Sequence, residues 1–128
     1  MEINIPYVLR EVQQASARYE RALVDNDIAV LDALFWNSPH TVRYGASENL
    51  LGYAAIQAFR AARPAVGLAR ETLRTVITTF GEDAATVHVE FQREGSARSG
   101  RQTQTWIRLP EGWRVVSAHV SLLDAAPT

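Results

Sequence analysis

Arg43 and Tyr19 are two residues of this chain whose side chains could act on a small anion if both face a pocket. Arg43 lies in the segment 41–44, which alternates like an extended strand, so Arg43 points to one face and its neighbours to the other. An arginine beside aromatic residues is either solvated, with Glu48 or Glu90 as an ion-pair partner, or directed at an anionic group. Tyr19 lies on the apolar side of a helical pattern. A tyrosine there is either a core residue with a satisfied hydroxyl or a polar group that faces a pocket.

The chemistry open to these two side chains is electrostatic and acid–base catalysis. A guanidinium binds a carboxylate through two parallel hydrogen bonds and stays charged when partly buried. A phenol hydroxyl can donate a proton or orient a water molecule. The chain has no cysteine and all 13 basic residues are arginine, which excludes thiolate nucleophiles, Schiff-base lysines and serine–serine–lysine amidases. It also lacks a glycine-rich phosphate loop and a GxSxG elbow. The histidines have no metal-ligand spacing, so we expect catalysis without a metal or cofactor.

Length and composition indicate one ordinary globular domain, residues 1–128. The hydrophobic fraction is 47% and the charged fraction 21%, values typical of a folded soluble protein. A net charge of −1 without any basic block gives no reason to expect a nucleic-acid partner. No apolar run approaches the roughly 20 residues that span a bilayer, and the N-terminus lacks the pattern of a signal peptide. We therefore expect no membrane partner and a cytoplasmic location.

The long element that must position Tyr19 is a helix that starts after Pro6. Apolar or small residues recur there every three or four positions, as in a helix with one face on a core: Val8, Val12, Ala15, Tyr19 and Ala22. Asn26 can end this helix. The elements expected next are a second helix capped by Asp27 and running through Phe35 to the break at Ser38-Pro39, a short strand at 41–44, an irregular crossover at 45–52 and a third helix at 53–62.

The second half of the chain changes to a two-residue period, which indicates strands. Four antiparallel strands are expected at 72–80, 85–92, 101–109 and 113–123, joined by polar turns and followed by a frayed tail at 124–128. Helices beside an antiparallel sheet make an α+β domain. A strongly curved sheet wrapped around the long first helix would enclose a conical pocket, with Tyr19 and Arg43 pointing into it.

Motifs across nearly the whole chain support a family resemblance. They are Tyr19-Glu20-Arg21-Ala22-Leu23, Phe35-Trp36, Arg43-Tyr44-Gly45, Glu48-Asn49-Leu50, Phe59-Arg60-Ala61-Ala62-Arg63-Pro64, Thr78-Thr79-Phe80-Gly81, Gly100-Arg101-Gln102 through Thr105-Trp106, and Gly112-Trp113 through His119-Val120-Ser121. With these motifs the chain resembles the SnoaL-like branch of the nuclear-transport-factor-like superfamily, and within it a subgroup associated with oxalurate and cyanuric acid breakdown. The resemblance implies a cone-shaped α+β barrel of the cystatin-like or SnoaL-like kind, commonly dimeric.

The resemblance also implies an activity. It points to a decarboxylating amidohydrolase that takes 1,3-dicarboxyurea, a small anionic nitrogenous substrate, to allophanate. Tyr19 and Arg43 match the helix tyrosine and strand arginine of the family and are thereby implied as the catalytic pair. Arg43 would hold a carboxylate and Tyr19 would be the proton donor or water orienter. An oxalurate-pathway homologue would look almost identical at these positions.

Three further residues are candidates for substrate binding: Trp36, His119 and Ser121. Trp36 lies beside the break after the second helix and could reach the pocket wall. His119 alternates in phase with Ser121, and one face of this last strand lines the cone while the other is free for a dimer. We expect a homodimer through the outer face of the sheet, since few charges occur among the apolar or neutral residues of the last strands, such as Ile107, Leu109, Val115 and Val120.

Arg60 and Arg63 fall at the end of the third helix, where cations favour the helix dipole, so we expect them to act as capping residues.

Two other functions of the protein remain open. It could be a non-catalytic partner of a pathway amidase, which an exposed apolar sheet face and a dry cone would favour. It could also be an isomerase or dehydratase of a hydrophobic substrate, which would need an aspartate or histidine base in the cone.

Overall fold

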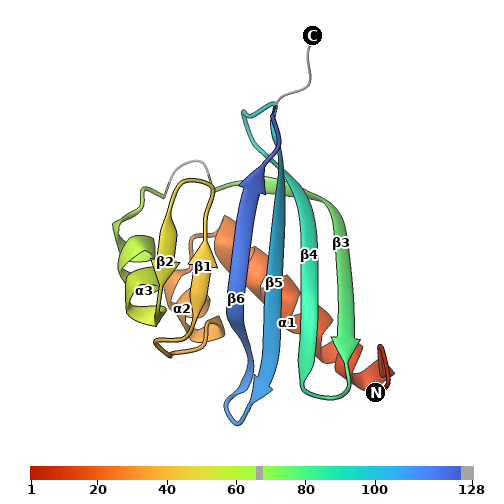
Figure 1. The fold of residues 1–128 in the computed structure, drawn as a ribbon. Coiled ribbons are helices and arrows are strands. Elements are labelled where there is room, and N and C mark those ends of the chain that lie inside the picture. The colour runs from red at the N-terminus through yellow and green to blue at the C-terminus, as the bar shows by residue number, and fades with distance from the viewer. Residues whose placement is uncertain (66–67, 125–128) are drawn as a thin grey trace.

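The computed structural model describes residues 1–65 and 68–124, which form three helices and six strands (Figure 1). The helices are α1 (Pro6–Val24), α2 (Ile28–Leu34) and α3 (Tyr53–Ala62). The strands are β1 (Val42–Tyr44), β2 (Asn49–Leu51), β3 (Arg70–Phe80), β4 (Ala84–Arg93), β5 (Ser99–Leu109) and β6 (Gly112–Leu122). The tail expected at 124–128 lies, except for Asp124, outside the described residues.

All six strands belong to one sheet in the order β2-β1-β6-β5-β4-β3. Strands β3 to β6 form the expected antiparallel meander, whereas β1 pairs parallel to β6 and antiparallel to β2. Helix α1 lies diagonally across one face of the sheet, and α2 and α3 lie beside β1 and β2 (Figure 1). The α+β class expected from the sequence is confirmed. No helix of the described chain is long and apolar enough to cross a membrane.

Helix α1 follows the apolar stripe of the sequence. Pro6 occupies its first turn, where a missing backbone N–H costs nothing. Val8, Val12 and Tyr19 are buried along one side. The end of the helix and the start of the next are also as expected, because the Asp27 side chain accepts a hydrogen bond from the Val30 N–H at 3.3 Å. Local capping and periodicity therefore determine this part of the fold.

The structure corrects the end of the second helix. Helix α2 stops at Leu34, and Phe35 is already extended at φ −94° and ψ 143°. The Phe35 ring is 2% exposed, and the segment pairs with the sheet through a bridge to Val115 and a 2.9 Å hydrogen bond from the Trp36 N–H. Burial of Phe35 against β6 therefore ends the helix before the Ser38-Pro39 break, since tertiary packing overrides a weak local preference.

The structure also corrects the crossover expected at 45–52. This segment contains β2, which pairs with β1 through the Val42–Leu51 and Tyr44–Asn49 positions. The hairpin closes with a 2.9 Å hydrogen bond from the Gly45 N–H to the Glu48 carbonyl. The strand expected at 41–44 is present as β1, whereas β2 has only three residues and no alternating pattern that would predict it.

The inner face of the sheet is apolar on β4 and partly polar on β5. On β4 the alternation expected from the sequence is confirmed, with the buried residues Ala85, Val87, Val89 and Phe91. On β5 the corresponding positions are Gly100, Gln102, Gln104 and Trp106. The two glutamines are 3% and 1% exposed. Buried amides require hydrogen-bond partners, so this side of the interior is unlike an ordinary apolar core.

A methyl group added at Gly100 should destabilise the protein. Gly100 lies opposite Phe91 in the β4–β5 register, and a Cβ there would come within 2.1 Å of the Phe91 ring. We expect Gly100→Ala to lower the free energy of unfolding by about 1–3 kcal/mol through overpacking. The exposed neighbour gives a control, because Arg101→Ala should change it by less than about 0.5 kcal/mol. Urea denaturation measures both, and equal stabilities of the two variants would contradict the packing argument.

Candidate functional site

Tyr19 and Arg43 line the same small cavity between the helices and the inner face of the sheet, although they come from α1 and β1. The cavity has a volume of about 30 Å³. Its lining combines apolar, amide and guanidinium side chains: Tyr19, Leu23, Arg43, Arg63, Leu68, Arg70, Arg93, Gln102 and Val120. Tyr19 and Arg43, which we expected to point into one pocket, therefore both line this cavity.

The cavity continues into a wider mouth of about 260 Å³. Five residues line both spaces: Arg43, Arg63, Leu68, Arg93 and Val120. The remaining residues of the mouth come from the β1–β2 hairpin and from α3 with the turn after it: Ala46, Ser47, Glu48, Phe59 and Pro64. We call the cavity and its mouth together the arginine pocket.

Aromatic packing holds Tyr19 at the inner end of the arginine pocket. The residue is 4% exposed. Its ring centroid lies 6.1 Å from that of Phe35 and 6.5 Å from that of Trp106, the latter in an edge-on arrangement. These contacts follow from the apolar stripe of α1, because Tyr19 continues the line of buried residues on that helix. The core therefore positions the ring, and the hydroxyl end faces the pocket.

Arg43 is held by an ion pair with Glu48. Its backbone is in register with Ala118 of β6, so the side chain points to the inner face of the sheet. The Nη1 atom donates to Glu48 Oε1 at 3.0 Å, and the guanidinium lies 5.8 Å from the Phe59 ring centroid. Burial raises the pKa of Glu48, but hydrogen bonds from Ser47 and Arg43 outweigh this effect and leave the pKa below its ordinary value. Glu48 therefore stays ionised and neutralises the charge of Arg43.

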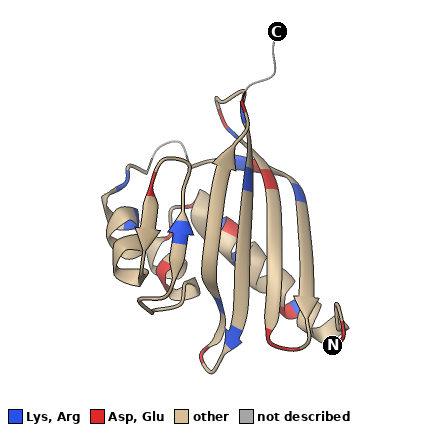
Figure 2. Cartoon of the chain, in the orientation of Figure 1, with Lys and Arg blue, Asp and Glu red and all other residues tan. Residues whose placement is uncertain are grey.

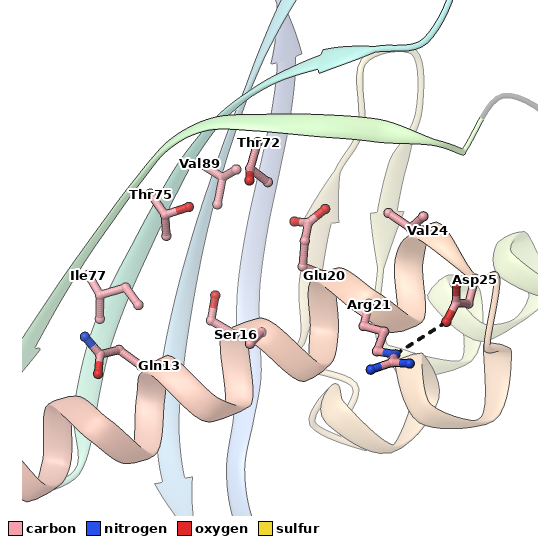
Figure 3. Close-up of a pocket in the computed structure, with 11 residues that line it drawn as sticks. Gln13, Ser16, Glu20, Arg21, Val24, Asp25, Thr72, Thr75, Ile77 and Val89 are labelled. Atoms are coloured by element: carbon pink, nitrogen blue, oxygen red, sulfur yellow. Dashed lines mark ion pairs between the residues drawn. The ribbon is translucent and has the colours of Figure 1, made fainter.

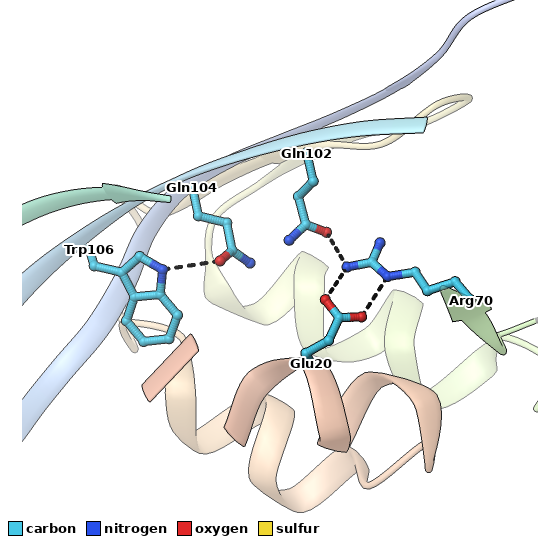
Figure 4. Close-up of polar contacts among 5 residues, drawn as sticks. All are labelled: Glu20, Arg70, Gln102, Gln104 and Trp106. Carbon is cyan, nitrogen blue, oxygen red and sulfur yellow. Dashed lines mark hydrogen bonds and ion pairs between the residues drawn. The ribbon is translucent and has the colours of Figure 1, made fainter. Parts of the chain in front are cut away.

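Arg70 is likewise neutralised, in this case by Glu20 of α1 (Figure 4). Two hydrogen bonds of 2.7 and 2.6 Å join the guanidinium to the carboxylate, and a third of 3.3 Å reaches Gln102 Oε1. The Arg70 side chain is 2% exposed and stacks on Phe91 at 4.2 Å. Bidentate pairing of this kind is the most favourable arrangement for a buried arginine.

Arg63 and Arg93 differ from these two arginines because no carboxylate of the described residues lies within ion-pair distance of either. The Nε and Nη2 atoms of Arg63 are buried without a hydrogen-bond partner in that part of the chain. Burial, followed by repulsion from Arg60, lowers the pKa of Arg63 below its ordinary value. Burial, followed by repulsion from Arg70 and then Arg43, lowers the pKa of Arg93. Both guanidiniums stay charged at neutral pH, so the pocket has an unfavourable positive potential.

The charges of the arginine pocket do not cancel. The pocket is lined by four arginines, of which Arg43 and Arg70 are paired with the carboxylates of Glu48 and Glu20. The other two leave an excess of two positive charges. Basic and acidic residues are both scattered over the ribbon (Figure 2), and the chain as a whole has a net charge of −1. The excess is thus a local property of the pocket, and a small anion with two negative charges would neutralise it.

Gln102 adds a hydrogen-bond donor to the pocket. Its Oε1 accepts from Arg70, while its Nε2 is buried without a partner among the described residues. Gln104 lies two residues further along β5 on the same face. Its Oε1 accepts a hydrogen bond from Trp106 Nε1 at 3.0 Å, and its Nε2 has no partner among the described residues (Figure 4). A buried donor without a partner is costly, so the Gln102 amide is suited to a ligand oxygen.

A larger groove lies outside the arginine pocket, between α1 and β3 (Figure 3). Its volume is about 660 Å³. The charged residues on it are Glu20, Arg21 and Asp25, and the Arg21–Asp25 pair is exposed, with a separation of 3.8 Å. Exposed ion pairs of this kind contribute little to stability. The unbalanced charge and the buried unpaired donors favour the smaller arginine pocket as the functional site.

The structure does not bring the three expected substrate-binding residues to this pocket. His119 and Ser121 lie on the outer face of β6, because the inner positions of that strand are the buried Ala118 and Val120. His119 packs edge-on against Tyr44 at 5.7 Å. Trp36 stacks with His40 at 6.2 Å and does not line the pocket. Strand periodicity separates two faces but does not identify the inner one, so the assignment of His119 and Ser121 to the pocket is corrected.

Sequence reasoning missed three of the four arginines and Gln102. Arg63 was expected as a helix cap, yet its side chain lines the pocket, and only its backbone N–H ends α3 by donating to the Phe59 carbonyl. Arg70 and Arg93 are register partners across the β3–β4 hairpin. Like charges directly opposite in a hairpin are unfavourable. Once the turn between the two strands was placed, this arginine pair could therefore have been recognised as a candidate for the site. No cluster of acids and histidines fit for a metal occurs in the described residues.

Comparisons with known proteins give the family and the fold. A family model described as AtzH-like matches residues 1–126. A protein of unknown function from Pectobacterium atrosepticum SCRI1043 is 56% identical, with a TM-score of 0.94 and 95% of each chain covered. A cystatin-like fold protein from Burkholderia xenovorans LB400 is 51% identical, with a TM-score of 0.93 and 99% of each chain covered. An NTF2-like protein of unknown function from Pseudomonas putida KT2440, 22% identical with a TM-score of 0.74 over 88% of this chain and 84% of that chain, shares the fold alone. No curated protein matches the chain.

Replacing Glu48 by glutamine should destabilise the protein at neutral pH and have little effect in acid. A folded-state pKa below the ordinary value contributes stability above the unfolded-state pKa, and this contribution is lost as the pH falls through the folded-state value. We expect Glu48→Gln to lower the free energy of unfolding by about 1 kcal/mol at pH 7, and the difference to close below about pH 4.

Urea denaturation as a function of pH measures this difference. The matched control is Glu90→Gln, because Glu90 pairs with Arg74 at 3.2 Å on an exposed part of the sheet. Its loss should cost less than about 0.5 kcal/mol at any pH. An effect of Glu48→Gln that is equally large at acidic and neutral pH would exclude the ionised pair as its cause.

Proposed function

The chain belongs to the AtzH-like family, and from this membership we propose that it converts 1,3-dicarboxyurea to allophanate in cyanuric acid catabolism. The observation that carries the proposal is the arginine pocket, where Tyr19 and Arg43 share a buried space with an excess of two positive charges. A dicarboxyurea is a dianion, so its charge matches that excess. An alternative substrate, also compatible with the family, is a related carboxylated urea of the oxalurate pathway.

The proposed reaction requires one proton and no cofactor. Each end of 1,3-dicarboxyurea is a nitrogen that carries a carboxylate. When that nitrogen gains a proton, its bond to the carboxylate carbon breaks, the bonding electrons remain on nitrogen and carbon dioxide leaves. The product, allophanate, retains one carboxylate and has a single negative charge. The protein must therefore hold a carboxylate and deliver a proton to the neighbouring nitrogen.

Arg43 and Tyr19 are suited to these two tasks. Arg43 uses Nη1 for Glu48, which leaves its other donors for a substrate carboxylate and fixes the orientation of the guanidinium. Tyr19 supplies the hydroxyl, either as the proton donor or as the group that orients a water. Tyr19 and Arg63 are close enough that a charge on the tyrosine would favour the charged arginine.

The rival readings fit the pocket less well. A dehydratase or isomerase needs an aspartate or histidine base, whereas the described cavity is lined by guanidiniums, a phenol, an amide and apolar groups. A purely structural partner protein would have no use for an interior with unpaired buried donors, which lower stability. Both features favour a protein that binds and transforms a small anion.

Two conservative substitutions test the catalytic pair. With freshly prepared 1,3-dicarboxyurea, the wild-type protein should form allophanate faster than the spontaneous reaction. Tyr19→Phe keeps the ring and removes the hydroxyl, so the rate should fall about 100-fold or more. Arg43→Lys keeps the charge and loses the bidentate fork, so the rate should fall at least about tenfold.

Matched controls come from residues of the same types outside the pocket. Tyr44→Phe and Arg101→Lys change exposed residues on the outer face of the sheet and should retain wild-type activity. Full activity in folded Tyr19→Phe would remove the tyrosine from the mechanism. A wild-type protein that does not exceed the spontaneous rate would favour the non-catalytic partner reading over the enzyme.

We also propose that the protein is a homodimer through the outer face of the sheet. Val115 and Val120, which were expected to support this surface, are core residues. The outer face nevertheless carries an uncharged row across the four long strands, since Val76, His88, Thr103 and His119 are successive register partners. An uncharged row of this kind is suited to pairing with a second copy.

Sedimentation velocity at micromolar concentration tests this dimer. The wild type should sediment as a dimer, and Thr103→Arg should shift it to a monomer by placing a charge in the middle of the row. Gln57→Arg places the same charge on the exposed side of α3 and should leave the dimer intact. A wild-type monomer would refute the dimer.

A further inference from the structure

Arg63 and Arg93 are two half-buried cations, and no carboxylate of the described residues lies within ion-pair distance of either. Partial burial of a charge without a partner is unfavourable, and such a charge in a pocket is a candidate for ligand binding. Both residues line the inner cavity and the mouth, as Arg43 does. Arg43 has Glu48 as a partner, whereas these two do not. The second pair of arginines therefore needs an explanation that the Tyr19–Arg43 unit does not give.

We propose that Arg63 and Arg93 form a second carboxylate site, which makes the arginine pocket selective for small linear dicarboxylates over monocarboxylates. The proposal rests on the proposed function, because it assigns the other end of the same substrate. One carboxylate would bind Arg43, next to Tyr19, and the other would bind Arg63 and Arg93. A carbonyl between the two ends would accept from the unpaired Nε2 of Gln102.

The size of the pocket supports an extended ligand. The inner cavity of about 30 Å³ is too small for a whole dicarboxylate, whereas the mouth of about 260 Å³ is not. The three arginines line both spaces. A linear molecule could therefore lie across the two and remain in reach of all three guanidiniums.

The backbone at both arginines supports a preformed site. Arg63 is the C-cap of α3, where its extended backbone and its 3.1 Å hydrogen bond to the Phe59 carbonyl direct it away from the helix. Arg93 is the last residue of β4, and its guanidinium lies 5.5 Å from the Phe91 ring centroid. Arg70, stacked on the same ring, is fixed by Glu20. Ordered elements therefore hold the two cations, which reduces the entropic cost of binding.

Selectivity follows from the number of charges. A dicarboxylate neutralises the excess of two positive charges, whereas a monocarboxylate leaves one half-buried guanidinium without a carboxylate partner. The lowered pKa values of Arg63 and Arg93 have the same cause, because burial and the neighbouring cations disfavour their charged forms. Loss of carbon dioxide converts the dianion to a monoanion. The same site would therefore favour release of the product.

Isothermal titration with two stable ligands tests the proposal without the reaction. Glutarate is a linear dicarboxylate, and glutaramate has the same chain with one carboxylate replaced by a neutral amide. We expect the wild type to bind glutarate at least roughly tenfold more tightly than glutaramate. Arg63→Gln and Arg93→Gln should each reduce this ratio toward one. Arg63→Lys, which keeps the charge, should retain part of the preference.

The controls separate loss of the site from loss of the fold. Arg101→Gln changes an exposed arginine on β5 and should keep the wild-type ratio. Circular dichroism establishes whether each variant is folded. If a glutamine variant unfolds, the affinity ratio of Arg63→Lys for glutarate over glutaramate tests the site instead, and it should lie between one and the wild-type ratio. Equal affinities of the wild type for the two ligands, no binding of glutarate, or an unchanged ratio in the folded glutamine variants would each overturn the second site.

The outcome for the site is independent of the outcome for the reaction. A wild type that prefers glutarate but does not process 1,3-dicarboxyurea would keep the dicarboxylate site and refute the proposed function. A wild type that processes 1,3-dicarboxyurea without preferring glutarate would keep the function and refute the site.

Discussion

The contact between α1 and the inner face of the sheet is the interaction on which both the core and the pocket depend. Val8 and Val12 are fully buried in it, and burial of such side chains is worth about 1.5–3 kcal/mol each. Tyr19 lies on the same stripe, further along the helix. Glu20, the next residue, joins α1 to β3 through the bidentate pair with Arg70. Any shift of α1 would therefore disturb the apolar core, the tyrosine and the charge balance of the pocket together.

The interior of the cone is graded in polarity along β5. Trp106 is buried in the apolar part, Gln104 accepts from its indole, Gln102 reaches Arg70, and Gly100 leaves room for the Phe91 ring. An apolar part excludes water and strengthens electrostatic interactions at the other end. The sheet thus supplies a rigid wall for the core and an ordered set of donors for the site.

The two paired arginines of the pocket contribute to stability, whereas the two unpaired arginines are suited to binding. Bidentate or hydrogen-bonded acids neutralise Arg70 and Arg43, so these two side chains hold elements together at a modest electrostatic cost. Arg63 and Arg93 have no such compensation in the described chain, and Arg93 lies opposite Arg70 across two strands. An interior selected for stability alone would not contain this repulsion. The pocket therefore resembles other functional sites, in which local strain is compensated by the rest of the fold.

The sequence by itself determined the features that depend on short-range patterns. The three-to-four-residue period determined α1 and the position of Tyr19 on it, and alternation with turn residues determined the four long strands. Only the tertiary structure decided which face of β6 is inside, which excluded His119 from the pocket, and that Phe35 leaves its helix to pack on the sheet. It also brought Arg63 and Arg93 to Arg43. These outcomes depend on contacts between distant segments and on buried charge, and neither has a period that a single sequence reveals.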